Sequence, residues 1–332
     1  MILKRDSKFE LWRIIAMCFI ILSHYSLFGN SPVTNIHTVF YEPFGEIGAD
    51  IFVMISGYFL CSQVPSIKKT TFRITKIWTR TIFYSWIILI LFFIFRHSQL
   101  TIMNTITSIF PVLFNEYWFI TSFIVLMTIV PILNNLIDNH SRKYLLLIII
   151  GMLFISGVQP LFSAFSPFGA ILNVGIMITS YLFAGYVKKY KLKVSNYFLI
   201  CAFVICLTFQ YILRHFINTN VVTYGILPFL CAASIFSIVV RSRSFYNPII
   251  NWIASSVFAS YLITSHPLVN SILWSKVINT SKINYQILSG PVIILCLLII
   301  TVMIDQIYLF LERKYFKYGI NHITNKINNI LN

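Results

Sequence analysis

Long apolar stretches separated by short polar segments recur along the whole chain. At about 20 apolar residues for each membrane crossing, this pattern predicts ten transmembrane helices. We place them at 10–28, 46–64, 80–96, 117–137, 144–159, 170–187, 196–213, 222–240, 250–270 and 287–311. No linker between them is long enough to hold a soluble domain. The sequence therefore predicts an all-α integral membrane protein in which residues 1–332 form a single polytopic domain.

The Lys and Arg residues predict the orientation of these helices. A basic segment follows every even-numbered helix, and the side bearing these segments carries 20 of the 25 Lys and Arg residues. The opposite side carries Arg96, Arg214, Lys276 and Lys282, and Arg13 lies within the first helix. Because positively charged loops stay in the cytoplasm, we expect both termini on the cytoplasmic side of the membrane.

Composition narrows the classes of function. The chain is 58% hydrophobic and 10% charged, with a net charge of +16. A basic chain can bind nucleic acid, but here the charge follows the topology, so we interpret it as an orientation signal and expect no nucleic-acid partner. The six cysteines all lie in apolar stretches without a Cys-x-x-Cys pair, so they indicate small core residues rather than metal ligands or disulfides.

The first apolar segment, FELWRIIAMCFIILSHYSLFG (9–29), contains three ionisable residues: Glu10, Arg13 and His24. Its internal charges and the lack of a small-residue cleavage site favour a retained helix over a signal peptide. Arg13 and His24 are eleven positions apart, about three turns plus 20°, so they share one helix face about 16 Å apart along the axis. Glu10 lies close enough to pair with Arg13.

His24 is the strongest candidate for chemistry in this segment. Ionisable residues inside membrane helices usually face a cavity or a partner, and an imidazole can take a proton from a hydroxyl near neutral pH. The alternative is that Glu10 and Arg13 lie in one headgroup layer and His24 in the other, with long side chains reaching the polar interface.

The spacing of Glu10, Arg13 and His24 resembles the first helix of the acyltransferase type 3 family, membrane O-acyltransferases of surface glycans and related acceptors. Five further segments are similar to family motifs and occur in the family's order. They are GEIGADIFVMISGYFL (45–60), FRITKIWTRTIFYSW (72–86), EYWFITSFIVLMTIVPIL (116–133), SYLFAGYV (180–187) and SSVFASYLITSHPLV (255–269). The resemblance covers nearly the whole chain.

Three positions depart from the family pattern. The first acid is Glu10, where Asp is more frequent, and the late His266 sits one position later than in many members. The usual Arg-x-x-Arg of the basic loop is Arg73-Ile-Thr-Lys76 here. Lys76 offers a phosphate a point charge but not the two-pronged hydrogen bonding of Arg.

The resemblance implies transfer of an acyl group, usually acetyl, from cytoplasmic acetyl-CoA to a hydroxyl of an outward-facing acceptor. It implies a multi-pass O-acetyltransferase of a bacterial cell membrane, acting on a cell-surface or capsular polysaccharide or its lipid-linked precursor. The bilayer, acyl-CoA, the glycan and proteins of glycan assembly are the expected partners. We expect no permanently bound cofactor and no metal.

The resemblance also assigns roles to residues. His24 would accept the acceptor's proton or be acylated itself, Asp50 would orient His24, and Glu10 completes the predicted catalytic set. The expected contacts of the coenzyme phosphates are Arg13, Arg73, Lys76 and Arg80, although topology alone explains many of these charges. The expected acceptor contacts are Tyr117, Trp118 and His266, although an aromatic belt is the ordinary explanation for the first two.

Two other functions remain open at this stage. The buried ionisable residues would also suit a transporter or glycan exporter with an ion or proton pathway, although no repeated halves are visible in the sequence. A protein that assists a glycan synthase without catalysing a reaction is the third alternative. Consumption of acetyl-CoA separates the first hypothesis from the other two.

Overall fold

The computed structural model describes residues 5–29, 40–63, 66–158, 169–217, 225–279, 283 and 286–331, and the regular elements within these ranges are all helical. The α-helices are α1 (Ser7–Phe28), α3 (Phe44–Leu60), α4 (Ile67–Phe95), α5 (Ile102–Ile109), α6 (Trp118–Asn139), α7 (Arg142–Val158), α8 (Gly169–Tyr190), α9 (Asn196–Ile217), α10 (Ile226–Arg241), α11 (Pro248–Thr264), α12 (Pro267–Ile272), α13 (Gln286–Leu311) and α14 (Lys317–Leu331). A π-helical turn, Glu312–Phe316, joins the last two.

The helices confirm an all-α, multi-pass membrane protein. Five segments are long and apolar enough to cross a membrane: α1, α4, α6, α9 and the stretch Ile287–Ile330, which contains most of α13 and α14. The shorter helices α10 and α11 are also apolar. Each of the ten predicted helices has a counterpart, whereas α5 and α14 were not predicted and α12 was predicted only as the end of the ninth helix.

The third predicted helix begins earlier than expected. Its predicted start was residue 80, but α4 begins at Ile67 and is continuous to Phe95. Ser66 caps it by accepting a hydrogen bond from the Lys69 backbone N–H at 3.4 Å. The basic segment that the sequence placed in a loop is therefore the first part of a helix, because charged side chains are compatible with an exposed helix surface.

The ninth predicted helix ends earlier than expected. Its predicted range was 250–270, but α11 ends at Thr264 and α12 starts at Pro267. Proline suits the first turn of a helix, and the His266 Nδ1 accepts a hydrogen bond from the Leu268 N–H at 3.2 Å. His266 thus caps a new helix instead of continuing the old one.

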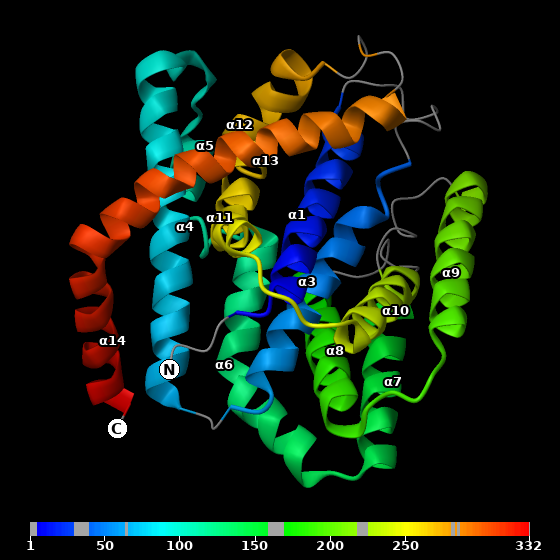
Figure 1. Ribbon diagram of the computed structural model, residues 1–332. Helices are drawn as coiled ribbons and strands as arrows, with labels where there is room; N and C mark the ends of the chain where they lie inside the picture. The colour runs from blue at the N-terminus through cyan, green and yellow to red at the C-terminus, as the bar shows by residue number, and fades with distance from the viewer. Residues whose placement is uncertain are drawn as a thin grey trace.

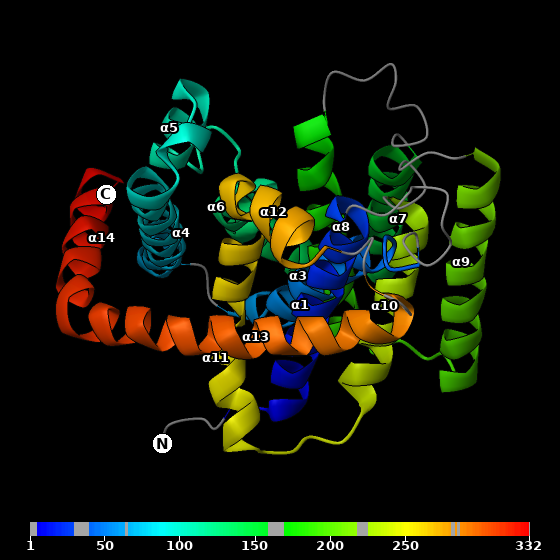
Figure 2. The same ribbon diagram turned by 90° about the horizontal axis from the view of Figure 1, so that it is seen from above.

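Helix α1 occupies the centre of the bundle in both views (Figures 1 and 2). It packs against α3, α11 and α13. In both views α4 and α14 lie on one flank and α9 on the opposite one, and α13 runs across the face of the bundle. The polar face of α1 is therefore surrounded by other helices.

Two glycines of α3 allow it to approach α1 closely. A Cβ atom on Gly48 would collide with the Ala16 carbonyl oxygen, and one on Gly45 would lie 2.6 Å from the Ser23 hydroxyl oxygen. Small residues at such crossings bring helix backbones together in membrane proteins. This contact fixes the start of α3 beside the part of α1 that carries His24.

A buried ion pair joins α4 to α13. The Arg80 guanidinium binds the Asp305 carboxylate, whose other oxygen accepts a hydrogen bond from the Tyr84 hydroxyl at 2.7 Å. Arg80 also lies 5.2 Å from the centre of the Tyr308 ring. Both charges are buried, so each depends on the other for its solvation.

We expect Asp305→Ala to destabilise the protein by about 3–5 kcal/mol, because it leaves the Arg80 charge buried without its counter-ion. Glu312→Ala is the matched control. It removes the partner of Lys76, whose side chain is 45% exposed, and is expected to cost less than about 1 kcal/mol. Thermal unfolding of the detergent-purified variants checks this, and equal midpoints for the two would contradict it.

Candidate active site and donor groove

A small cavity of about 40 Å³ lies beside His24, near the C-terminal end of α1. Helices α1, α3, α6 and α11 and the turn before α3 form its walls. The lining residues are Ile20, Ser23, His24, Leu27, Glu42, Gly45, Glu46, Ala49, Trp118, Phe119 and Tyr261. We call this space the His24 cavity. The structure thus places the imidazole on a cavity wall, where a substrate can reach it.

The His24 ring is held between α11 and its own helix. Its Nδ1 lies 3.4 Å from the Ser265 hydroxyl oxygen, and its ring centre lies 5.6 Å from that of Phe28 and 6.5 Å from that of Tyr261. The side chain is half-buried. With Nδ1 beside Ser265, the second ring nitrogen remains for a ligand in the cavity.

The α3 carboxylate that lines the His24 cavity is Glu46, and the predicted Asp50 is not among the lining residues. Glu46 lines the His24 cavity, whereas the Asp50 Oδ1 accepts a hydrogen bond from the Ser180 hydroxyl of α8 at 2.7 Å. Gly45 packs against Ser23, and Asp50 lies five residues further along α3, a rise of about 7.5 Å. The described hydrogen bond of Asp50 is thus to Ser180, its Oδ2 has no hydrogen-bond partner, and its role toward His24 stays a prediction.

A buried ion pair borders the cavity on its other side. The Glu42 carboxylate lies 3.0 Å from the Arg214 Nε and 3.5 Å from its Nη2. Burial raises the pKa of Glu42, and the hydrogen bond and charge of Arg214 lower it again. The Glu42 backbone carbonyl also accepts a hydrogen bond from Ser23 at 3.0 Å. The pair ties the turn before α3 to α9.

The predicted contact between Glu10 and Arg13 is confirmed. The Arg13 Nη1 lies 2.5 Å from the Glu10 Oε1, and the guanidinium lies 5.9 Å from the Phe59 ring centre. Glu10 is 14 residues from His24, about 21 Å along the helix axis. At this separation Glu10 is not in contact with His24, so its membership of the catalytic set stays a prediction.

The basic residues of α4 differ in whether their charge is paired with an acid of the protein. Arg80 is buried against Asp305, and Lys76 lies 2.6 Å from Glu312, so both of these predicted phosphate contacts are paired within the protein. Arg73 is half-buried, with its Nη2 2.5 Å from the Gln63 side-chain oxygen. Because Gln63 is neutral, the charge of Arg73 is not neutralised by this contact.

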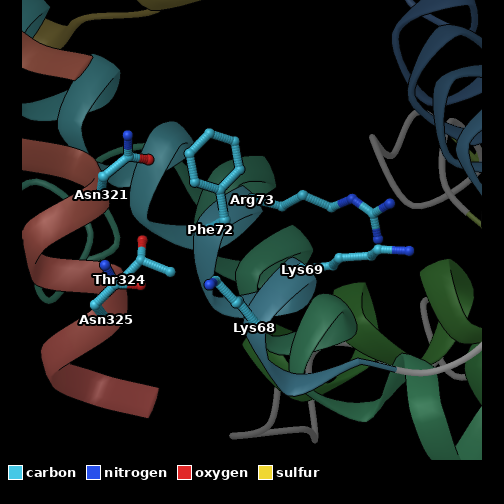
Figure 3. A pocket seen from close by; sticks show the side chains of 7 residues that line it. All are labelled: Lys68, Lys69, Phe72, Arg73, Asn321, Thr324 and Asn325. Atoms are coloured by element: carbon cyan, nitrogen blue, oxygen red, sulfur yellow. The ribbon is translucent and has the colours of Figure 1, made fainter. Parts of the chain in front are cut away.

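Arg73 borders a groove of about 720 Å³ between the start of α4 and α14. Its lining residues are Lys68, Lys69, Phe72, Arg73, Asn321, Thr324 and Asn325. Figure 3 shows Phe72 and Lys68 on the side of α14, whereas Arg73 and Lys69 extend side by side away from it. We call this hollow the α4–α14 groove. The sequence analysis did not predict α14, which forms one of its walls.

Of the three predicted acceptor contacts, only Trp118 lines the His24 cavity. Tyr117 is fully buried, and its hydroxyl donates to the Leu262 carbonyl oxygen at 3.0 Å. His266 is also fully buried, with its Nε2 3.2 Å from the Glu116 Oε1. Tyr117 and His266 therefore hold α6, α11 and α12 together instead of facing a substrate.

The contact between His266 and Glu116 is a structural hydrogen bond. The His266 Nδ1 accepts from a backbone N–H, so its Nε2 is the donor in the neutral ring. Burial raises the pKa of Glu116 to about 7, although a hydrogen bond from Ser108 lowers it. Among the described residues, no group of three or more His, Cys, Asp or Glu side chains is placed to hold a metal ion.

Comparison with known proteins assigns the chain to a family. The profile of an acyltransferase domain, that of type 3, matches residues 6–306, which include every residue of the His24 cavity and the α4 wall of the groove. No curated protein and no solved structure matches the chain. Since the match covers more than half of the 332 residues, the chain belongs to the acyltransferase type 3 family of membrane acyltransferases.

Proposed function

We propose that the protein is an O-acetyltransferase that moves an acetyl group from cytoplasmic acetyl-CoA to a hydroxyl of a surface or capsular polysaccharide or its lipid-linked precursor. The observation that carries this proposal is His24 on the wall of a small cavity in a chain of the acyltransferase family. The family match favours an acyltransferase over a transporter.

The proposal includes a topology and a place in the cell. The chain forms one polytopic domain that crosses a bacterial cell membrane ten times, with both termini in the cytoplasm. The distribution of Lys and Arg supports this orientation. It places the α4–α14 groove on the cytoplasmic side, where acyl-CoA is available, and the His24 cavity toward the acceptor.

In the reaction, the acceptor hydroxyl attacks the thioester carbonyl carbon and its proton passes to the free ring nitrogen of His24. A C–O bond forms as the C–S bond breaks, and the CoA thiolate leaves. The proton on His24 then returns to the sulfur and gives the thiol. If the imidazole nitrogen attacks first, an acyl-His24 forms and the acceptor hydroxyl completes the transfer in a second step.

The size of the His24 cavity favours a short acyl group. A cavity needs about 10–15 Å³ of such volume to hold one water molecule, so a volume of about 40 Å³ has room for a few heavy atoms. The two carbons and one oxygen of an acetyl group are close to this size, whereas a fatty acyl chain or a sugar ring is much larger. Trp118 lies on the wall, where an acceptor sugar ring has an aromatic face to contact.

Arg73 is the described α4 residue best suited to the phosphates of acetyl-CoA. Lys76 and Arg80 are engaged by Glu312 and Asp305, whereas Arg73 binds a neutral Gln63. Lys69 extends beside Arg73 in Figure 3, so the two cations present positive charge together on the side of α4 that faces away from α14. Arg forms two parallel hydrogen bonds with a phosphate and Lys adds a point charge.

Replacing His24 by Ala is expected to abolish acetylation, because the proton acceptor or nucleophile is lost. The test expresses the native protein and His24→Ala at matched membrane levels in a strain that lacks the gene. Proton NMR of the purified surface polysaccharide then measures ester-linked acetyl. Full acetylation by the variant contradicts the mechanism, and no acetyl with the native protein contradicts the proposed function.

Replacing Arg73 by Ala is expected to raise the KM for acetyl-CoA about 10- to 100-fold with little change in kcat, because a hydrogen bond to a charged group contributes about 1.5–3 kcal/mol. Lys143→Ala, which removes an exposed cation outside the α4–α14 groove, is the control and should leave KM unchanged. Release of CoA thiol by membrane vesicles measures both constants. The same KM change in both variants would point to a general charge effect.

A further inference from the structure

Glu46 is a buried acid without a partner among the residues that the structure describes. Its side chain forms none of the described ion pairs or hydrogen bonds, and its Oε2 is buried with no hydrogen-bond partner. Of the other two acids around the start of α3, Glu42 binds Arg214, and one Asp50 oxygen accepts from Ser180 while its Oδ2 is also buried without a hydrogen-bond partner; of these two, Asp50 does not line the His24 cavity. An unpaired buried carboxylate is costly, so its presence calls for a functional explanation.

The position of Glu46 supplies that explanation. Glu46 and His24 both line the His24 cavity, one on α3 and the other on α1. The tight contact of Gly45 with Ser23 fixes the height of Glu46 relative to the imidazole. Because the cavity has a volume of only about 40 Å³, a small group that fills it contacts both walls.

The charge of Glu46 complements the state that His24 reaches during the reaction. When the imidazole takes the acceptor proton it becomes a cation at a half-buried position in the helix bundle. A carboxylate across the cavity stabilises that cation, and this interaction is absent while the imidazole is neutral. Such a differential interaction lowers the barrier instead of tightening substrate binding.

We infer that Glu46, rather than Asp50, is the carboxylate that serves His24, acting as a positioning residue that stabilises the imidazolium. The inference rests on the proposed function. Glu46 forms and breaks no covalent bond: the proton remains on the imidazole until it returns to the CoA sulfur. Glu42 does not take this role because its charge is already balanced by Arg214.

Glu46→Gln tests the inference, since it keeps the shape of the side chain and removes its charge. Membrane vesicles from a deletion strain expressing each variant receive acetyl-CoA, and released CoA thiol gives kcat and KM per folded protein. We expect kcat to fall at least about tenfold with KM for acetyl-CoA within about twofold. Glu46→Asp, which keeps the charge on a shorter side chain, is expected to recover part of the loss.

A stability measurement separates this role from a structural one. Because Glu46 has no described partner, Glu46→Gln should leave the thermal midpoint of the purified protein unchanged or raise it. Asp50→Asn is the matched comparison, one turn away on the same helix. We expect the fold-decrease in kcat per folded protein to be at least ten times smaller for Asp50→Asn than for Glu46→Gln.

The outcomes distinguish the two proposals. If His24→Ala is inactive but Glu46→Gln retains native kcat, the inference is overturned and the proposed function stands. The result is the same if kcat falls as much in Asp50→Asn as in Glu46→Gln. The same holds if the loss in Glu46→Gln comes with a lowered midpoint and no recovery by Glu46→Asp. Native vesicles that release no CoA thiol from acetyl-CoA overturn both.

Discussion

The close approach of α1 and α3 is the constraint on which the site depends. Gly45 and Gly48 leave no room for a side chain between the two helices, so the register of α3 against α1 is fixed by backbone contact. Lipid tails are as apolar as leucine side chains, so burying apolar side chains does not favour one register of the two helices over another. The backbone contacts at the glycines decide the register instead. The same register places Glu46 on the cavity wall that His24 shares.

Paired charges set the second constraint. Arg80 with Asp305, Arg214 with Glu42, and Arg13 with Glu10 are each held in a pair, and each pair joins or steadies helices. Losing one partner of such a pair is costly, so these residues serve the fold before any ligand. Glu46, His24 and Arg73 differ because their described contacts involve neutral groups or none. The division separates residues that support the bundle from those free to meet a substrate.

Much of the fold was predictable because membrane helices leave a strong signal in the sequence. The ten apolar stretches all correspond to helices, and the three-residue spacing of Glu10 and Arg13 correctly predicted their contact. The start of α4 was missed because hydropathy cannot tell an exposed charged helix from a loop. The role of His266 was missed because its partner, Glu116, is 150 positions away in the chain.

The sequence by itself determined the helices, the family and the choice of His24, since apolar length, charge distribution and motif spacing are local properties of the chain. Only the tertiary structure decided which ionisable side chains form ion pairs or hydrogen bonds with other residues. It paired Lys76 and Arg80 with acids more than 200 positions away, bonded Asp50 to Ser180, buried Tyr117, and left Glu46 facing the cavity. Hydrogen bonds and ion pairs depend on distances of a few ångströms between helices, and those distances follow from packing rather than from local sequence.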